Sequence, residues 1–326
     1  MKVDSAYLPV AVVIPVLNEK QCLPEILDAL LSLHPKPQEV VIVDAGSTDG
    51  SLDLITSWIA RAAVVGLRVN LIESYGALPG AARNVGISNA HEHWIAFLDA
   101  GVNPSPEWLK ELWNCQQTTQ AEAVYGTCRF ECKTSLGEMI CAASYGVGRT
   151  RPTLPGSLFS RKLLHAVGGF NDHLRAGEDK LFKQALNDAS VSAPICDKSE
   201  VIYAHFPSSL TAAIQKVFAY HKSIAANPNV YQRRENIFIM ASMLAGLLAI
   251  INLSLGGLLV AGYVCARGVI DPMRRSQRII WWSSPWRPLV FPGVVALLDI
   301  ASLLGSMYGR LKYLLRKQYA NTAKQP

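Results

Sequence analysis

Short apolar runs alternate with helical spacing of apolar residues along the first hundred residues of the chain. Val10–Val16 is a continuous, largely β-branched run, which is typical of a strand buried on both faces. The runs at 39–43, 67–73 and 94–98 have a similar character, and segments with apolar residues three or four positions apart separate them. Strand and helix therefore alternate four times, which predicts an α/β domain with a mostly parallel, Rossmann-like sheet and flanking helices.

Polar residues directly follow three of these predicted strands. Asn18, Asp44 and Asp99 each lie just beyond the end of an apolar run. In a parallel sheet the carboxyl ends of neighbouring strands meet at one edge, and ligands bind beyond that edge. The pattern therefore predicts a nucleotide-binding site formed by these loops.

The chain changes character after about residue 235. Charged residues make up 17% of the whole sequence and apolar residues 50%, whereas soluble domains average about 25% charged residues. Ile237–Val264 contains no charged residue, while the first 235 residues have the composition of a soluble protein. We therefore expect a globular domain over residues 1–228 and a membrane-associated helical region over residues 229–326.

Basic residues accumulate beside the apolar segments of the second region. The formal net charge is +6, and much of the excess lies after Arg233. Basic residues in this position favour contacts with anionic lipid headgroups on the cytoplasmic side of a membrane. Nucleic-acid binding would place them on a soluble face instead, so we expect none. The seven cysteines are scattered without zinc-type spacing, which favours reduced thiols in a cytosolic domain.

The apolar segments allow two arrangements in a membrane. Ile237–Val264 exceeds the ~20 residues needed to span a bilayer, whereas Leu289–Tyr308 carries Asp299 at its middle. A carboxylate there costs about 2.5–3.5 kcal/mol unless it is paired or faces water. Two spans would also place the arginines of segment 267–278 outside the cell, against the positive-inside tendency. If Asn252–Gly257 is a turn, the first run is a re-entrant hairpin, the second lies in the interface, and every basic cluster stays inside.

Four segments occur in a fixed order between residues 8 and 225. They are Ile14-Pro-Val-Leu-Asn-Glu19, Val43-Asp-Ala-Gly-Ser-Thr-Asp-Gly50, Ala82-Arg-Asn-Val-Gly86 running to Phe97-Leu-Asp-Ala-Gly101, and Gly168-Gly-Phe-Asn171 running to Gly177-Glu-Asp179. Each alone is weak, but together they resemble the family 2 glycosyltransferases, which share the GT-A fold. The resemblance implies that the chain transfers a sugar from a nucleotide-sugar donor.

The same resemblance implies a nucleoside pocket near the first two segments. Pro15, Asn18 and Glu19 match the segment that lines this pocket. Asp44 matches the loop aspartate that accepts hydrogen bonds from the base, in keeping with N3–H of uracil and a UDP-sugar. The family often has a second acid at the next position, where this chain has Ala45.

The third segment matches the family's diphosphate region. Arg83 has a planar guanidinium suited to phosphate oxygens, although a surface ion pair is its structural alternative. Asp99 occupies the first position of the family's Asp-x-Asp motif, but the third position is Gly101. In GT-A enzymes these carboxylates hold a divalent cation, Mn²⁺ or Mg²⁺, that neutralises the leaving diphosphate. With the second acid absent, His205 is the best candidate for a replacement ligand, and a core histidine is the alternative.

The fourth segment matches the acceptor side of the reaction. Asp179 corresponds to the family's catalytic base, and Glu178 would orient it or cap the following helix. Inversion needs one carboxylate to take the acceptor proton while the hydroxyl attacks the anomeric carbon opposite the diphosphate. Both acids could instead be ordinary residues of a helix N-terminus, where the helix dipole favours them.

The sequence therefore predicts an inverting glycosyltransferase with a membrane-bound or surface-glycan acceptor, such as a lipid-linked one. The expected location is the cell membrane, with the catalytic domain on the cytoplasmic side. Two other functions stay open. A sugar-nucleotidyltransferase would carry a glycine-rich phosphate loop, which the segment after Val16 lacks. A degenerate binding subunit would explain Ala45 and Gly101, but it leaves Asp99, Glu178 and Asp179 without a reason.

Overall fold

The computed structural model describes residues 6–207, 209–227, 246, 248, 253–276 and 285–322. The chain divides into two compact units. Unit 1 comprises Met1–Arg129 and Thr150–His205, and unit 2 comprises Phe130–Arg149 and Phe206–Pro326. The sequence predicts a single boundary after residue 228, whereas the structure groups residues 130–149 and 206–227 with the C-terminal helices.

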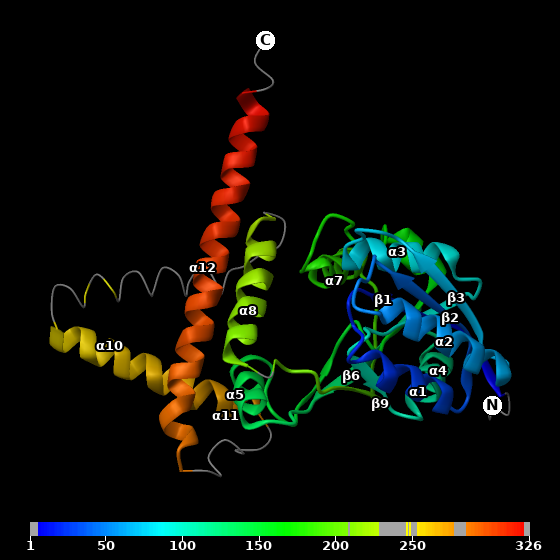
Figure 1. Ribbon diagram of the computed structural model, residues 1–326, viewed down its shortest axis with the longest axis horizontal. Coiled ribbons are helices and arrows are strands. Elements are labelled where there is room, and N and C mark those ends of the chain that lie inside the picture. Colours follow the sequence, from blue (N-terminus) through cyan, green and yellow to red (C-terminus); the bar gives the residue numbers. More distant parts are fainter. Residues whose placement is uncertain are drawn as a thin grey trace. The chain divides into compact units, whose positions relative to one another are not determined.

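Unit 1 is an α/β layer structure (Figure 1). Its strands are β1 (Tyr7–Val16), β2 (Lys36–Asp44), β3 (Arg68–Glu73), β4 (Trp94–Phe97), β5 (Val102–Pro104), β6 (Ala123–Phe130), β7 (Thr150–Pro152), β8 (Leu158–Ser160) and β9 (Ile195–Tyr203). Its helices are α1 (Leu23–Ser32), α2 (Ser51–Val64), α3 (Pro79–Asn89), α4 (Trp108–Thr119), α6 (Arg161–Ala166) and α7 (Glu178–Asp188). The four predicted alternations of strand and helix, from β1 to β4, are confirmed.

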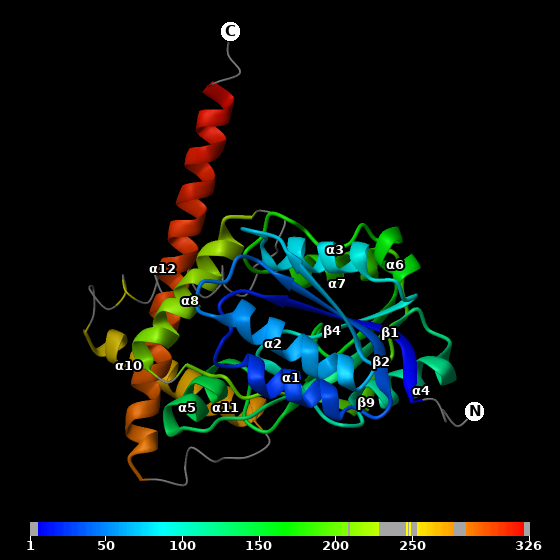
Figure 2. The same ribbon diagram turned by 45° about the vertical axis from the view of Figure 1, so that its right-hand side comes forward.

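Among the described residues, nine strands form one mixed sheet in the order β3-β2-β1-β4-β8-β6-β9-β5, and β7 pairs with β6. The half made of β3, β2, β1 and β4 is parallel, as the buried apolar runs predict. The other half pairs antiparallel. Helices α1, α2 and α4 cover one face of the sheet, and α3 and α7 cover the other (Figures 1 and 2). This arrangement leaves the carboxyl ends of the parallel strands open to ligands.

Apart from the end of β6, the regular elements in the described part of unit 2 are helices. Its elements are α5 (Ser135–Ser144), α8 (Leu210–Ala225), α10 (Leu253–Cys265), the short π-helix η1 (Ala266–Ile270), α11 (Asp271–Arg275) and α12 (Arg287–Thr322). Much of the first predicted apolar run, Ile237–Val264, lies outside the described residues. The hypothesis of a turn over Asn252–Gly257 is wrong from residue 253 onward, because α10 includes Leu253–Gly257. A leucine-rich segment keeps its helix despite two adjacent glycines, each of which costs only about 1 kcal/mol.

Helices α8 and α12 pack closely side by side, and α12 extends beyond α8 (Figures 1 and 2). The approach depends on two glycines one turn apart in α12. A Cβ added at Gly305 would lie 2.5 Å from the carbonyl oxygen of Phe218, and one at Gly309 would lie 2.3 Å from that of Lys222. Only glycine permits this distance between the two backbones. The ammonium of Lys222 also lies over the Tyr308 ring, 4.9 Å from its centroid.

Asp299, which the sequence marks as the obstacle to a simple membrane span, has partners in unit 2. Arg267 of η1 donates to it through Nε (2.8 Å) and Nη2 (2.7 Å), and the Tyr263 hydroxyl donates to it at 2.8 Å. The Asp299 side chain is 15% exposed and that of Arg267 is 21% exposed. The carboxylate is therefore neutralised inside the helical unit, which satisfies the condition for placing it in an apolar environment.

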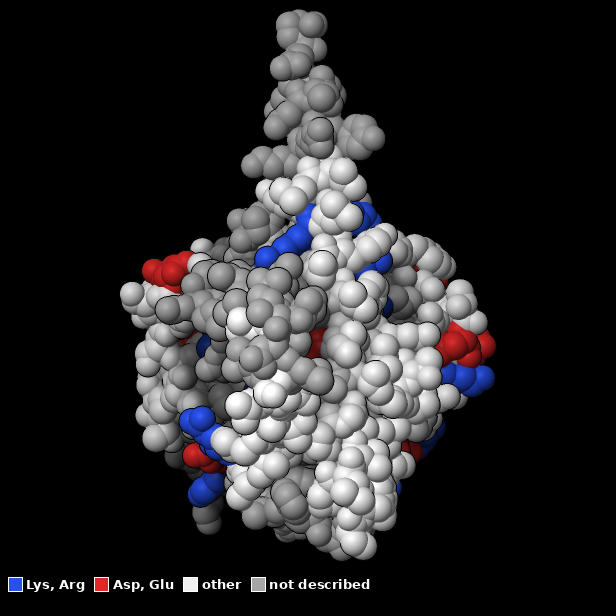
Figure 3. All heavy atoms as spheres, turned by 90° about the vertical axis from the view of Figure 1, so that its left-hand side faces the viewer, with Lys and Arg blue, Asp and Glu red and all other residues white. Residues whose placement is uncertain are grey.

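The rest of α12 presents an apolar surface. Its segment Arg287–Leu315 is, among the described residues, the one helix long and apolar enough to cross a membrane by length and composition. Exposed large apolar side chains include Leu289 and Val290 near its start, and from Leu297 onward they recur every three or four residues: Leu297, Ile300, Leu304, Met307, Leu311 and Leu314. Figure 3 shows wide uncharged areas in the described part of one face of the molecule. Such a surface is typical of contact with lipid or another apolar partner.

Candidate active site

The predicted ligand edge of the sheet is present in unit 1. Asp44 is the last residue of β2, where it pairs with Val16 of β1. Asp99 follows β4, whose Phe97 pairs with Val13 of β1. The loops that carry Asp44 and Asp99 therefore leave the same edge of the sheet, on either side of β1.

Asp44 is both a turn residue and an available acceptor. Its side chain is buried, and Oδ2 accepts the backbone N–H groups of Gly46 (3.0 Å) and Ser47 (2.9 Å). Asp44 therefore forms an Asx-type turn with its own loop. Its other oxygen, Oδ1, is buried and has no hydrogen-bond partner among the described residues. Because a buried acceptor without a partner is costly, Oδ1 is suited to a ligand donor. Pro15 lies half-buried on the neighbouring strand β1.

Asn18 and Glu19 tie the end of β1 to the Asp44 loop. Asn18 has a φ of 57°, a left-handed conformation that asparagine tolerates better than most residues. Its N–H donates to Oγ of Ser47 (2.9 Å), and its Oδ1 accepts the N–H of Thr48 (2.8 Å). The N–H of Glu19 donates to Oγ of Ser51 (3.0 Å). These bonds show how both residues hold the shape of the loop next to Asp44.

Arg83 joins the donor-side and acceptor-side acids. Its guanidinium donates through Nη2 to Oδ1 of Asp99 (2.7 Å) and through Nη1 to Oε1 of Glu178 (2.8 Å). The Arg83 side chain is 5% exposed, and it lies over the Phe170 ring at 5.6 Å. Burial opposes its charge, but the two carboxylates outweigh burial and hold the pKa of Arg83 above its usual value. Arg83 is thus an internal bridge in this structure, and its contact with a diphosphate stays a prediction.

The small residues of α3 let this bridge form. A Cβ on Gly86 would lie 2.4 Å from a methyl carbon of Val13, so the backbone of α3 packs tightly against the Val13 side chain of β1. Asn84 then binds the loop before α7: its Nδ2 donates to the Phe170 carbonyl (2.8 Å), and its Oδ1 accepts the Phe170 N–H (2.9 Å). Side chains on α3 therefore reach both Asp99 and the loop that leads to Glu178.

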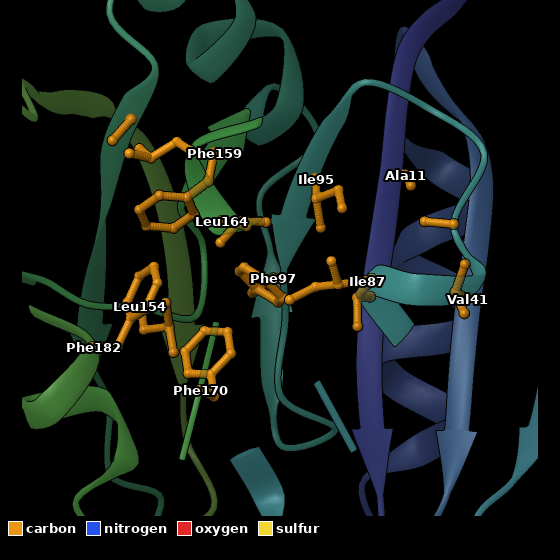
Figure 4. Packing of buried hydrophobic residues seen from close by; sticks show 14 of the residues in the cluster. Ala11, Val41, Ile87, Ile95, Phe97, Leu154, Phe159, Leu164, Phe170 and Phe182 are labelled. Atoms are coloured by element: carbon orange, nitrogen blue, oxygen red, sulfur yellow. The ribbon is translucent and has the colours of Figure 1, made fainter. Parts of the chain in front are cut away.

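A cluster of aromatic rings packs next to the Arg83 bridge. The rings of Phe170 and Phe182 stack with centroids 4.4 Å apart, and Phe97 meets Phe170 edge-on at 5.3 Å. Figure 4 shows these rings together with Phe159 between β4 and α7. Aromatic pairs of this kind stabilise beyond simple burial, so they fix α7 and its first residues relative to the end of β4.

The two acids that begin α7 have different environments. Glu178 is buried, and burial raises its pKa even though Arg83 acts in the opposite direction. Asp179 is exposed, and its Oδ1 accepts the N–H of Lys180 (2.9 Å). Of the pair, Asp179 is therefore the carboxylate available to an acceptor. Burial, assisted by the nearby Asp179, raises the pKa of Tyr125 to about 12; no sequence signal had singled out Tyr125.

His205 lies beside the position of the missing second acid. Strand β9 pairs Tyr203 with Val102, which places His205 next to Gly101: a Cβ at Gly101 would lie 3.9 Å from Cδ2 of His205. The imidazole Nε2 is buried, 3.4 Å from Oε2 of Glu25, without the geometry of a hydrogen bond. Glu25 belongs to α1, and no motif in the sequence marks it.

Asp99 and His205 alone are too few to hold a cation, so a bound donor would have to supply further ligands. Oδ1 of Asp99 is bound to Arg83, whereas Oδ2 has no hydrogen bond or ion pair with any described residue. The imidazole of His205 lies near Gly101, with Cδ2 3.9 Å from where a Cβ would stand. Within the described ranges no three His, Cys, Asp or Glu side chains form a metal-binding group. Asp99 and His205 could thus share a divalent cation with a donor diphosphate, and they do not form a complete protein cage.

The fold of unit 1 and its acidic edge are typical of glycosyltransferases with the GT-A fold. Residues 11–185 match glycosyl transferase family 2, and the chain belongs to this family. Its solved structural neighbours include the mannosyltransferase PcManGT from Pyrobaculum calidifontis in complex with GDP-Man and Mn²⁺, with a TM-score of 0.54 and 17% identity. That similarity covers 92% of this chain and 87% of the other, and it shows the GT-A fold.

Curated relatives carry several glycosyltransferase names. The chain is 29% identical over 225 residues to glycosyltransferase AglE of Haloferax volcanii, covering 65% of this chain and 72% of AglE. It is 28% identical over 190 residues to the poly(ribitol-phosphate) beta-glucosyltransferase of Bacillus spizizenii, covering 54% and 29%. It is 32% identical over 106 residues to an undecaprenyl-phosphate 4-deoxy-4-formamido-L-arabinose transferase of Serratia proteamaculans, covering 32% of each. The chain thus spans less than a third of the last two relatives.

Proposed function

We propose that the protein transfers a sugar, with inversion, from a UDP-sugar to a membrane-bound or surface-glycan acceptor. The observation that carries this proposal is the bridge from Asp99 through Arg83 to Glu178. It joins the partly exposed carboxylate of Asp99 to the buried Glu178 at the start of α7, next to an exposed Asp179. A donor bound at Asp99 would therefore have the solvent-facing carboxylate of Asp179 nearby.

The base of the donor would lie at Asp44. Its unpartnered Oδ1 can accept N3–H of uracil, and the loop fixed by Asn18 would frame the nucleoside. A guanine base also offers N–H donors, and PcManGT binds GDP-Man. The choice of uracil rests on the single available acceptor oxygen, because Ala45 supplies no second acid for a second donor.

The transfer needs one proton acceptor and no covalent intermediate. The acceptor hydroxyl attacks the anomeric carbon, the bond from that carbon to the diphosphate oxygen breaks, and Asp179 takes the hydroxyl proton. The nucleoside diphosphate leaves with the bonding electron pair. Glu178 cannot serve as this base while Arg83 holds it, so its role is to position the start of α7. When bound, a divalent cation held by Asp99 and His205 would neutralise the leaving diphosphate.

The acceptor is proposed from the names of the relatives and from unit 2. Two of these relatives are named for poly(ribitol-phosphate) and undecaprenyl-phosphate, both phosphate-bearing acceptors. The apolar side of α12 supports attachment to a membrane. Because α12 packs on α8, which carries Lys216 and Lys222, a position in the membrane interface suits it better than a span through the centre.

The membrane proposal has a direct test. A cysteine at the exposed Met273, in a Cys265→Ser background, should be shielded from a membrane-impermeant thiol reagent in intact cells and react after permeabilisation. This outcome is expected if α11 lies on the cytoplasmic side. Ready labelling in intact cells would favour two spans and would overturn the interfacial arrangement.

The catalytic proposal is tested by donor hydrolysis and transfer with the wild type and Asp179→Asn. Loss of a positioned general base costs about 10²–10⁴-fold in rate, while donor binding should be retained. Asp188→Asn, at the other end of α7, is the matched control and should keep full activity. If wild type and Asp179→Asn both bound donor and were equally inert, the degenerate binding subunit would be the better interpretation. Release of pyrophosphate when UTP and a sugar 1-phosphate are supplied would instead indicate a sugar-nucleotidyltransferase.

A further inference from the structure

An exposed tyrosine lies beside the turn that Asp44 makes. Tyr75 follows β3 and is 78% exposed. Strands β2 and β3 are parallel neighbours, so the loops after them leave the same edge of the sheet. The N–H of Ser74 donates to the carbonyl of Asp44 (2.7 Å). The N–H of Gly76 donates to the carbonyl of Ala45 (2.9 Å). Tyr75 is therefore held, from both sides along the chain, against the loop proposed for the nucleoside.

The side chain of Tyr75 is fixed although it is exposed. Its hydroxyl donates to Oε2 of Glu73 at 2.5 Å. Its ring packs on the backbone of the Asp44 loop, because a Cβ at Gly46 would lie only 2.9 Å from Cδ1 of Tyr75. Gly46 also has a φ of 96°, which glycine adopts without strain. The ring thus has a set position before any ligand binds, and little side-chain freedom is left to lose on binding.

Gly46 connects the ring of Tyr75 with the acceptor oxygen of Asp44. The N–H of Gly46 donates to Oδ2 of Asp44 (3.0 Å), and the buried Oδ1 has no partner among the described residues. The hydrogen bond to Glu73 chiefly raises the pKa of Tyr75 above its ordinary value, and the charge of Asp44 adds to this shift, in keeping with a phenol close to Asp44. An exposed aromatic ring and an acceptor without a partner therefore lie on one loop surface. A nucleobase matches both, since it has a flat π face and N–H groups at its edge.

We infer that Tyr75 stacks on the nucleobase of the donor and holds the base in place while Asp44 accepts its N–H group. The inference rests on the proposed function, because it takes the ligand at Asp44 to be a nucleotide. Stacking tolerates every base, since each has a π face. Asp44 would therefore select the base, and Tyr75 would supply affinity without selecting.

Titration calorimetry with UDP, on the full-length protein in detergent, measures the contribution of the ring. Loss of one base–aromatic stack weakens binding about 5- to 150-fold, so Tyr75→Ala should raise the dissociation constant of UDP within that range. Tyr75→Phe keeps the ring and should bind UDP nearly as well as the wild type. Tyr220→Ala is the matched control in α8, since this tyrosine is also exposed (40%), and it should leave the constant unchanged. Equal constants for wild type and Tyr75→Ala would overturn the inference.

A nonaromatic analogue separates stacking from mere support of the Asp44 loop. The dihydrouracil analogue of UDP keeps N3–H and both carbonyl groups, but its saturated ring carbons remove the flat π system. Wild type and Tyr75→Phe should bind UDP more tightly than this analogue, whereas Tyr75→Ala should bind the two equally. If Tyr75→Ala kept the wild-type preference for UDP, the tyrosine would only support the loop, and stacking would be refuted.

The same titrations separate this inference from the proposed function. If the wild type bound neither UDP nor GDP, the proposed transferase function would fail, and the inference with it. If the wild type bound UDP and Tyr75→Ala bound it equally well, the function would stand and stacking alone would be wrong. A preference for GDP would overturn the choice of uracil. Tyr75→Ala should then weaken GDP binding by a similar factor, and an unchanged constant for GDP would refute stacking as well.

Discussion

The Arg83→Met variant removes the guanidinium that joins Asp99 to Glu178 and keeps a side chain of similar length. A hydrogen bond to a charged group contributes about 1.5–3 kcal/mol. The bond to Glu178 counts in full, because that side chain is 9% exposed. The bond to Asp99 is discounted to at most about 1 kcal/mol, because its side chain is 40% exposed and screened by water. The variant should therefore lose about 2–4 kcal/mol of unfolding free energy at pH 7.

The loss should depend on pH through Glu178. Burial already holds the pKa of Glu178 above its ordinary value of 4.5, and Arg83 is the main group that lowers it. Without Arg83 the pKa rises further. A carboxyl whose pKa is higher in the folded than in the unfolded state stabilises the fold when protonated, and that stabilisation is lost as pH rises through the folded pKa. The difference between variant and wild type should thus be small near pH 4.5 and grow toward pH 8.

Denaturant unfolding in detergent, followed by the fluorescence of the buried Trp58 and Trp108 in unit 1, measures this difference at several pH values. Arg68→Met is the matched control: its ion pair with Glu92 is long, at 3.4 Å, and the arginine side chain is 48% exposed. The control should change stability by less than about 0.5 kcal/mol. A loss in Arg83→Met that did not vary with pH, or no loss at all, would refute the account of the bridge.

Three other substitutions test separate parts of the structure. Asp44→Asn should raise the dissociation constant of UDP about 10- to 100-fold in titration calorimetry, since it removes a charged acceptor; an unchanged constant would contradict the role of Oδ1. Asp299→Asn should cost about 2–4 kcal/mol of stability in detergent unfolding, because Arg267 loses its bidentate partner; full stability would mean that the ion pair is dispensable. Gly309→Ala should lower the melting temperature, because the new Cβ would lie 2.3 Å from a backbone oxygen of α8, whereas Gly293→Ala, with nothing within 4 Å, should raise it slightly.

Local patterns were sufficient to predict the first half of unit 1. Buried apolar runs mark β1 to β4, and the polar residues after them mark the ligand edge, because both signals depend on neighbours in sequence. The antiparallel half was harder to anticipate. Strands such as β5, β7 and β8 have three residues each, too few for a periodic signal, and their pairing depends on distant partners.

The candidate site, too, could be predicted from the sequence only in part. Motif positions identified Asp44, Asp99 and Asp179, yet the burial of Arg83 between two acids depends on residues 16 and 95 positions away. The link from Glu25 to His205 joins α1 to the end of β9, which no spacing rule connects. Asp299 likewise looked costly in sequence because its partner lies 32 residues upstream, in a short π-helix.

The space around Gly101 bears on how such enzymes diversify. A Cβ at this position would meet only Tyr203 and His205, at the ordinary contact distances of 3.7 and 3.9 Å. Packing therefore does not forbid an aspartate there, and a single codon change could restore the second acid. A site with one protein charge fewer releases a cation together with its diphosphate more easily. In many enzymes departure of product, and not chemistry, sets the turnover rate. Absence of the second carboxylate would then weaken binding of the metal, so that the metal and the nucleoside diphosphate product leave the site faster.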